Sequence, residues 1–346
     1  MEQLCKLSLI FTVGTLGFLI FRIVKMPNPA LLGAMFCTGV LNMAGLYPTL
    51  TLWPISFVAN VVIGIMLGRQ IDRNFLRRIR EVFIYVVLMA AGLIVLSLIC
   101  GFTFYKLTDV SLKTSLVATS AGGITEMLIF GMSIDADLTV VACLQLFRVV
   151  IFLTLIPFIA KLGKGSTSAT SSHHIKNFSD IEFFDRKEYL YMIMIAFVCG
   201  GIAYYMQIPT GAMLGAMLSA GIFSVFVKKT YCYDTKFRVA AQIGLGVVMG
   251  QRMTYSIVTQ LDSILFPALA TSVVMLLGCV LLAYILHRIS GWDMLTCLLC
   301  AAPAGLSQIT VFAEEIGADS LTASLFHTVR ILSIVVFYPW IVLWVV

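Results

Sequence analysis

The sequence predicts an all-α polytopic membrane protein built from two inverted repeats. Composition is the first reason: 60% of the 346 residues are hydrophobic and 12% are charged, whereas soluble domains contain about 25% charged residues. The second reason is that apolar runs of helical length alternate with short polar connections. The third is an ungapped duplication, in which residues of the first half recur 182 positions later, as Gly123 does at Gly305.

Each half contains six apolar runs. In the first half they cover about 7–24, 30–46, 54–68, 82–105, 111–132 and 138–161, and in the second about 189–206, 212–227, 239–251, 264–286, 294–316 and 320–346. The third run of each half is short for a full crossing, which needs roughly 20 residues. We therefore expect it to be tilted or to lie in thinned bilayer.

The two membrane repeats are expected at 1–162 and 188–346, separated by a linker at 163–187. The linker is rich in Ser, Thr and charged residues and has no apolar period before Phe183. Gly33-Ala34 and Gly215-Ala216 occupy matched positions in the second run of each repeat. Small residues of this kind let helices approach closely, so we expect them at helix–helix contacts.

Basic residues give the orientation of the repeats. They follow the third run of the first half at Arg69, Arg73, Arg77, Arg78 and Arg80, whereas the matching loop of the second half has only Arg252. They precede the third run of the second half at Lys228, Lys229, Lys236 and Arg238, and are absent from 45–56. Because basic loops prefer the cytoplasm, equivalent loops face opposite sides, which indicates an inverted repeat with a cytoplasmic linker.

An inverted repeat needs an odd number of crossings in each half. The run 111–132 is interrupted and is the best candidate for a re-entrant pair of half-helices. The prediction is therefore about ten transmembrane helices plus a broken or re-entrant helix pair in each half. If all six runs cross, the repeat is parallel and the linker lies outside, against its positive charge.

Helix-breaking residues interrupt the fifth apolar run in each half. The first break reads Ser120-Ala-Gly-Gly-Ile-Thr-Glu126 and the second Ala301-Ala-Pro-Ala-Gly-Leu-Ser-Gln308. Broken helices expose helix N-termini, which attract anions, and carbonyls, which bind cations. Kinked helices are the simpler alternative, but matched positions favour a site. The candidate substrate-binding residues are Gly122, Gly123, Thr125 and Glu126 in the first break, and Pro303, Gly305, Ser307 and Gln308 in the second.

Two arginines are predicted near the middle of the membrane. Arg148 and Arg330 lie about ten residues into the last run of each half, where a charged side chain costs roughly 2.5–3.5 kcal/mol. Gln145 and His327 precede them by three residues and share their helix faces. All four are candidate donors to an anionic or carboxylate-bearing substrate. The alternative is that each arginine caps half-helix carbonyls or pairs with a carboxylate.

Other polar residues have more than one interpretation. Glu126 would either carry a proton, because burial raises the pKa of a carboxyl group, or neutralise the arginine of its own half. Asp137 and Asp319 precede the final runs and are expected to be N-caps. Asn60 and Gln242 are matched polar residues in the third runs. They would hydrogen-bond across helices or line a cavity.

Several functional classes lack support in the sequence. It contains no Walker loop and no GxGxxG after a strand, and its four histidines lack metal-ligand spacing. The net charge of +6 indicates basic loops at a membrane rather than a nucleic-acid surface. We therefore predict no enzyme activity, no cofactor, no metal site and no nucleic-acid partner.

The paired motifs resemble a known family. Gly-Gly-Ile-Thr-Glu-Met and Pro-Ala-Gly-Leu-Ser-Gln, each followed by an Asp and then by an Arg before a Pro, are similar to the AbrB duplication family of bacterial inner-membrane proteins. The two Leu-Gly-Ala-Met segments strengthen the resemblance, which covers both halves. Members have been described as regulators of gene expression, as ammonia monooxygenases and as transporters. Gln308 departs from the acidic residue of the first motif, which weighs against a symmetric two-carboxylate mechanism.

The resemblance implies a multi-pass protein of the bacterial inner membrane. We expect a secondary transporter of a small, anionic or carboxylate-bearing solute, bound near the membrane midplane where the broken helices meet. The alternative is a membrane sensor or regulatory protein that affects gene expression indirectly. The expected partners are the small-molecule or ion substrate and membrane lipid, and the hypothesis leaves a homo-oligomer open.

Overall fold

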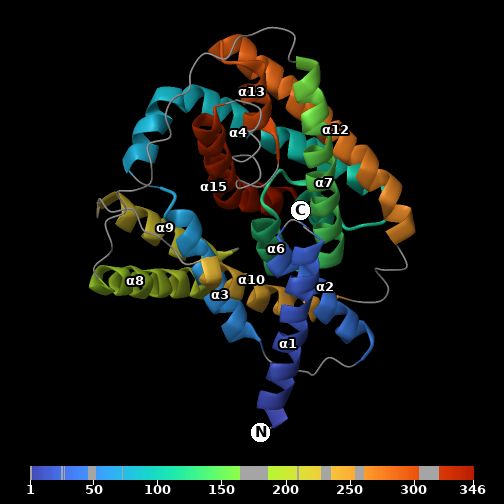
Figure 1. The fold of residues 1–346 in the computed structure, drawn as a ribbon, viewed down its shortest axis with the longest axis vertical. Helices are drawn as coiled ribbons and strands as arrows, with labels where there is room; N and C mark the ends of the chain where they lie inside the picture. Colours follow the sequence, from blue (N-terminus) through green and yellow to red (C-terminus); the bar gives the residue numbers. More distant parts are fainter. Residues whose placement is uncertain are drawn as a thin grey trace. The chain divides into compact units, whose positions relative to one another are not determined.

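The fold is helical throughout the part of the chain that the computed structural model describes, residues 2–24, 26, 28–45, 52–71, 73–163, 186–208, 210–226, 235–253, 261–303 and 319–346 (Figure 1). The first half forms α1 (Glu2–Ile23), α2 (Pro29–Met43), α3 (Trp53–Gly68), α4 (Arg73–Leu107), α5 (Leu112–Thr119), α6 (Ile124–Ser133) and α7 (Leu138–Gly163). The second forms α8 (Arg186–Tyr205), α9 (Gly211–Phe226), α10 (Thr235–Gly250), α12 (Leu261–Ser290), α13 (Met294–Ala301) and α15 (Ser320–Val345). The predicted all-helical class is confirmed. The predicted linker lies almost entirely outside the described residues.

Among the described residues, three helices are long and apolar enough to cross a membrane: Phe75–Leu107 in α4, Ile264–Ser290 in α12 and Thr322–Val345 in α15. Seven further apolar helices in the same part of the chain are shorter, at 10–17 residues. Large apolar side chains such as Ile84 and Leu277 are exposed on the long helices. A surface with many exposed apolar side chains is typical of contact with lipid rather than water. The number of crossings and the cellular membrane stay predictions.

Residues at the helix starts explain several boundaries. Ser111 caps α5 by accepting a hydrogen bond from the amide of Thr114, and Asp293 caps α13 by accepting one from Leu295. Hydroxyl and carboxylate oxygens are preferred at this position because the first amides of a helix lack partners. The two caps are 182 residues apart, so α5 and α13 begin at matched positions and each contains eight residues.

The described chain folds into two compact units, and each takes helices from both halves of the sequence. Unit 1 consists of Met1–Arg73, Ile124–Ala142 and Glu182–Asp262, and therefore contains α1–α3, α6 and α8–α10. Unit 2 consists of Asn74–Gly123, Cys143–Ile181 and Ser263–Val346, and contains α4, α5, most of α7, α12, α13 and α15. The proposed repeat boundaries at 162 and 188 stay a prediction.

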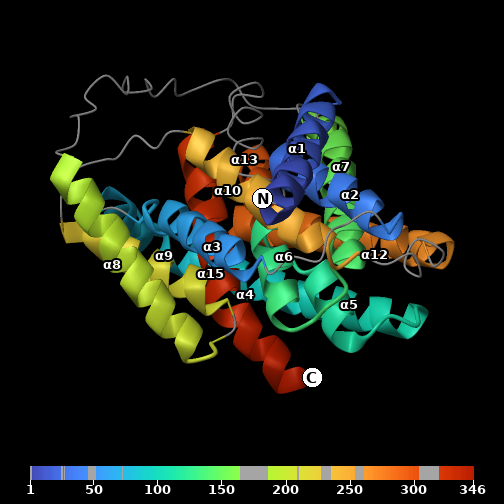
Figure 2. The same cartoon turned by 90° about the horizontal axis from the view of Figure 1, so that it is seen from below.

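Unit 1 is held together by reciprocal packing between the halves. Helix α3 packs against α9 and α10 packs against α2, while α8 and α9 form a hairpin beside α3 (Figure 2). A Cβ atom on Gly64 would collide with the backbone carbonyl of Met213, and one on Gly246 would collide with that of Leu31. Because no side chain fits there, glycine is required at both positions. The two contacts are related by the 182-residue offset.

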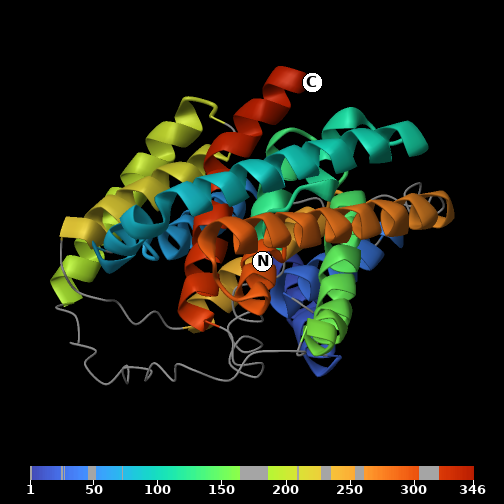
Figure 3. The same cartoon turned by 90° about the horizontal axis from the view of Figure 1, so that it is seen from above.

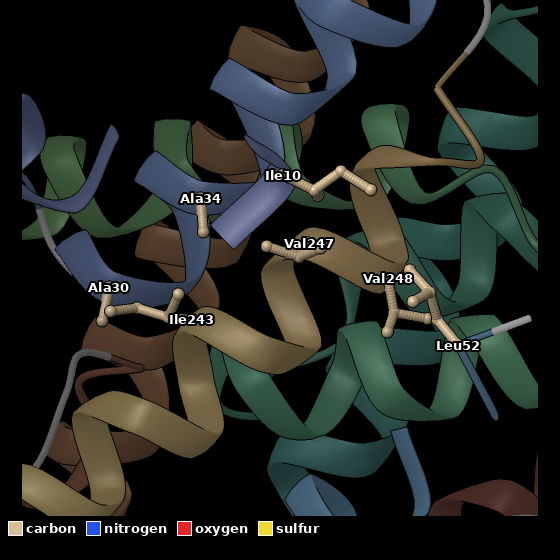
Figure 4. Close-up of a cluster of buried hydrophobic side chains, with 7 residues drawn as sticks. All are labelled: Ile10, Ala30, Ala34, Leu52, Ile243, Val247 and Val248. Atoms are coloured by element: carbon tan, nitrogen blue, oxygen red, sulfur yellow. The ribbon is translucent and has the colours of Figure 1, made fainter. Parts of the chain in front are cut away.

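Two buried clusters in unit 1 repeat this relationship. One is formed by Ile10, Ala30, Ala34, Leu52, Ile243, Val247 and Val248 (Figure 4). The other is formed by Val61, Ile65, Met192, Ala196, Ala212, Ala216 and Ala220. Five pairs are matched, among them Ala30 with Ala212 and Val61 with Ile243. Apolar side chains contributed by both halves therefore fill both clusters, and the alanines among them allow close helix packing.

In unit 2, the duplication-related helices α4 and α12 lie side by side and run antiparallel (Figure 3). A Cβ atom on Gly92 would meet Leu282, and one on Gly278 would meet Leu96. Along this contact, residue numbers decrease in α12 as they increase in α4. Helices α4 and α12, which occupy matched positions in the two halves, therefore have opposite directions.

Candidate functional site

The predicted break in the first half is confirmed. Helix α5 ends at Thr119, Ser120 is extended with φ −60° and ψ 142°, and α6 begins at Ile124. In the second half α13 ends at Ala301, and Ala302 is also extended, with φ −64° and ψ 122°. Pro303 follows this residue. The candidate residues Gly305, Ser307 and Gln308 lie outside the described residues.

Arg148 in α7 binds the backbone at the end of α5. Its guanidinium donates to the carbonyls of Ser120 and Gly122, the latter at 2.9 Å, and to the side-chain oxygen of Gln145. The Gln145 amide donates to the carbonyls of Val117 at 3.3 Å and Ser120 at 3.1 Å. The last carbonyls of a helix have no intrahelical partner and carry partial negative charge, so buried donors stabilise this end.

The second half contains a matching arrangement. Arg330 in α15 donates to the carbonyl of Ala302 at 2.6 Å, and His327 Nε2 donates to the carbonyl of Leu299 at 2.9 Å. The acceptors correspond to Ser120 and Val117 of the first half. Both arginines therefore occupy the carbonyl-capping position that was the structural alternative. Their contact with a substrate stays a prediction.

Further hydrogen bonds fix the first break within unit 2. Ser97 Oγ in α4 accepts from the amide of Ala121 at 2.9 Å, and Thr119 Oγ1 donates to the carbonyl of Ser97 at 3.3 Å. Tyr338 in α15 donates through its hydroxyl to the carbonyl of Leu116 at 2.8 Å. Side chains from three other helices thus position the end of α5.

The guanidinium of Arg148 is buried and has no ion-pair partner among the residues that the structure describes. Its exposed fraction is 4% and that of Arg330 is 3%. Over the described ranges, no carboxylate forms an ion pair with Arg148, and the positive charge of Arg330 acts on it repulsively. Glu126 is buried in the first turn of α6, in unit 1. Its two predicted roles stay predictions.

Thr125 belongs to a polar cluster in unit 1 that also includes Asn28 and Gln242. Its hydroxyl oxygen lies 3.5 Å from both Asn28 Nδ2 and Gln242 Nε2. Gln242 therefore makes the predicted hydrogen bond across helices. The oxygen of its matched residue, Asn60, is buried and has no partner among the residues described. Sequence analysis missed Asn28, although its position before Pro29 at a helix start was a usable signal.

The predicted N-caps are confirmed at α7 and α15. Asp137 accepts hydrogen bonds from the amides of Thr139 at 2.9 Å and Val140 at 3.2 Å. Asp319 accepts one from the amide of Thr322 at 3.2 Å. Burial raises the pKa of Asp137, and its two amide hydrogen bonds oppose that rise.

A small cavity lies beside the first break in unit 2. Its polar lining consists of Arg148, Thr119 and Cys100 together with Thr271 and Ser272 of α12. Sequence analysis found Arg148 and missed the others, because the residues of α4 and α12 reach this place only through packing between distant helices. Their hydroxyl groups gave no repeated spacing that could have identified them.

Comparison with known proteins gives the family. A model described as "Transition state regulatory protein AbrB" matches residues 1–162 and 48–346. The chain belongs to the AbrB family. The AbrB-family "Putative regulator AbrB" of Escherichia coli (strain K12) is 24% identical over 344 residues, covering 97% of this chain and 94% of the relative. "Uncharacterized protein YhjN" of Bacillus subtilis (strain 168) is 22% identical over 292 residues, covering 82% and 76%. The family predicted from the paired motifs is confirmed.

The AbrB-family chain shows no evident metal centre in its described part. No group of three or more His, Cys, Asp or Glu side chains there is placed to hold a metal ion. The described site is a set of hydrogen-bond donors around interrupted helices, and these donors bind backbone carbonyls.

Proposed function

We propose that this AbrB-family protein is a secondary transporter of a small anionic solute in the bacterial inner membrane. The observation that carries the proposal is the buried guanidinium of Arg148, which contacts neutral carbonyl groups at an interrupted helix. A charge in an apolar interior is costly unless it is paired. A solute with negative charge would supply the pairing during its passage.

The direction of equivalent helices supports the inverted repeat in this proposal. Helices α4 and α12 run antiparallel in unit 2, and both are long enough to cross a bilayer. In unit 1 the contacts of Gly64 with Met213 and of Gly68 with Met217 rise together, so α3 and α9 run parallel. Since α9 corresponds to α2, this is the arrangement expected if α2 and α3 form a hairpin in an inverted repeat. Inverted repeats give a transporter equivalent openings to both sides.

The topology has its own test. Gln70 and Arg252 are matched, so we propose that they face opposite sides of the membrane, with 163–187 in the cytoplasm and about ten crossings in all. Single-cysteine variants Gln70→Cys and Arg252→Cys would be labelled with an impermeant maleimide in intact cells and in inverted vesicles. Labelling of the two positions from the same side would contradict the inverted arrangement.

Transport is tested by flux into proteoliposomes. Purified protein would be assayed with radiolabelled formate, acetate and small dicarboxylates, and with bromide, under imposed proton or sodium gradients. We expect uptake of at least one anion above protein-free liposomes, and a loss of at least tenfold in Arg148→Gln. Arg252→Gln is the matched control, because Arg252 is exposed. Absence of flux for every anion tested would overturn the proposal.

A second candidate is a membrane sensor that binds the solute without moving it and affects gene expression indirectly. The name of the Escherichia coli relative, "Putative regulator AbrB", favours this candidate. Solute binding without flux, together with altered transcripts after deletion of residues 164–185, would support it. Unchanged transcripts in the deletion strain would argue against it.

A further inference from the structure

We propose that the cavity beside Arg148 binds one compact monovalent anion, either a halide or the carboxylate group of a small organic acid. The cavity lies within unit 2 and is formed by α4, α5, α7 and α12. The inference deepens the proposed function, on which it rests for the idea that the bound anion is the transported solute. The binding site itself is argued from charge, unused hydrogen-bond donors and size.

The positive charge of Arg148 is the first reason to expect an anion in the cavity. Arg148 contacts two backbone carbonyls and one amide oxygen, all of them neutral. These groups satisfy hydrogen bonds but leave one full positive charge in a buried place, and the charge of Arg330 adds repulsion. An anion next to Arg148 would remove both costs. None of the cavity's lining residues is acidic, so no carboxylate of the lining would repel that anion.

Arg148 also has a hydrogen-bond donor, its Nε, that no described acceptor uses. The terminal nitrogens of Arg148 are occupied by the carbonyls and by Gln145, whereas its Nε is buried and has no partner in the described part of the chain. A buried donor without an acceptor is unfavourable. Arg148 lines the cavity, and a rotation of its guanidinium would let Nε donate to an anion seated there.

The hydroxyl groups of Thr119, Thr271 and Ser272 line the cavity. Thr119 donates to the carbonyls of Ser115 at 2.9 Å and of Ser97 in α4 at 3.3 Å, Thr271 to that of Pro267 at 2.8 Å, and Ser272 to that of Ala268 at 2.7 Å. Apart from Ser97, these acceptors are carbonyls that lie four residues earlier in the same helix. A hydroxyl can leave such an intrahelical bond by rotating. The hydroxyls therefore provide adaptable donors to an anion beside Arg148.

The size of the cavity limits which anions would bind, and the residues at matched positions indicate how many would bind. The cavity has room for a group of about the size of one water molecule, so a halide or one carboxylate oxygen would enter with a small displacement of the lining side chains, and a bulkier anion would require a larger one. The residue matched to Thr119 is Ala301, and those matched to Thr271 and Ser272 are Met89 and Ala90. The three lining hydroxyls are therefore replaced by apolar side chains at the matched positions. We expect one such anion per chain.

The first experiment measures thermal unfolding of purified protein in detergent, at constant ionic strength, with bromide, formate or sulfate. We expect a saturable rise of the midpoint with bromide and formate but not with sulfate. Arg148→Gln should lose the rise, and Thr119→Val and Ser272→Ala should each need several-fold more anion. Arg252→Gln and Thr103→Val are the matched controls and should respond like wild type. An equal rise in Arg148→Gln, or no rise in wild type, would overturn the inference.

The second experiment locates the anion, because Arg148→Gln can also weaken the fold by freeing the carbonyls of α5. Crystals grown in bromide should show an anomalous peak within hydrogen-bond distance of Arg148 Nε. A cavity without a peak at saturating bromide would refute the site even if flux depended on Arg148, and the transport proposal would stand. A peak in a protein that shows no flux would retain the site and remove transport.

Discussion

The two interrupted helices share their backbone chemistry and differ in the side chains around it. At both breaks an arginine of the last helix donates to the carbonyl 28 residues earlier, Arg148 to Ser120 and Arg330 to Ala302. The first break has a cavity lined by hydroxyl groups, among them that of Thr119, whereas the residue matched to Thr119 in the second half is Ala301. The shared part holds the helix ends, and the differing part is where specificity for a solute can arise.

The neighbours of the two arginines differ in a second way. Gln145 both donates to the end of α5 and accepts from Arg148. His327 donates through Nε2 to Leu299, and its buried Nδ1 has no partner among the described residues. The side-chain amide of Gln145 carries its donor and its acceptor at the same end, whereas the two nitrogens of a neutral imidazole point away from each other. Arg148 is therefore also held by a hydrogen bond to Gln145 of the same helix.

The largest effect is expected where the two halves make the same backbone contact. Gly64→Val and Gly246→Val should each lower the free energy of unfolding by about 3 kcal/mol or prevent folding, since the new side chain would strike a carbonyl. Denaturation of purified protein measures this. Gly201→Ala is the control, because its Cβ would come no closer than 3.9 Å to Phe57. Unequal effects at Gly64 and Gly246 would break the equivalence of the halves.

The next effect separates the two arginines. Arg148→Gln and Arg330→Gln should both lower the free energy of unfolding, by about 1–3 kcal/mol, because each leaves a buried carbonyl unpaired. Only Arg148→Gln should lose the stabilisation by bromide. Unfolding curves with and without bromide measure both quantities. If Arg330→Gln also lost the bromide response, the proposed difference between the breaks would be wrong.

A smaller effect tests the matched caps. Asp137→Ala and Asp319→Ala should each cost about 1 kcal/mol of stability, because each leaves an amide at a helix start without its acceptor. Equilibrium unfolding would measure the loss, and Asp137→Asn would serve as a control that keeps a capping oxygen. A cost below about 0.3 kcal/mol at either position would show that the cap does not stabilise its helix.

The smallest effect comes from exchanging the neighbours of the arginines. His327→Gln should change stability by less than about 1 kcal/mol, since Gln can donate to the Leu299 carbonyl as Gln145 does to Val117. Gln145→His should cost more, because Arg148 loses an acceptor. Thermal unfolding of the two single variants would compare them. Equal costs would indicate that the difference in hydrogen bonding has no energetic weight.

The sequence allowed most helices to be predicted, because long apolar runs and matched breaks are local signals. It also indicated Arg148, Gln145 and their counterparts, since a charge in an apolar run needs a reason. It could not reveal that α3 packs on α9, or that Thr271 and Ser272 of α12 line the cavity near Arg148. Those contacts join residues about 120–150 positions apart and depend on packing rather than on any repeated spacing.

The reciprocal packing in unit 1 has an evolutionary consequence. The third helix of each half lies against the second helix of the other half. Two separate copies of one short polypeptide would form the same contacts around a two-fold axis. The packing of unit 1 is therefore what a fusion of two such copies would produce. After such a fusion each copy could change alone, which would allow differences such as that between Thr119 and Ala301.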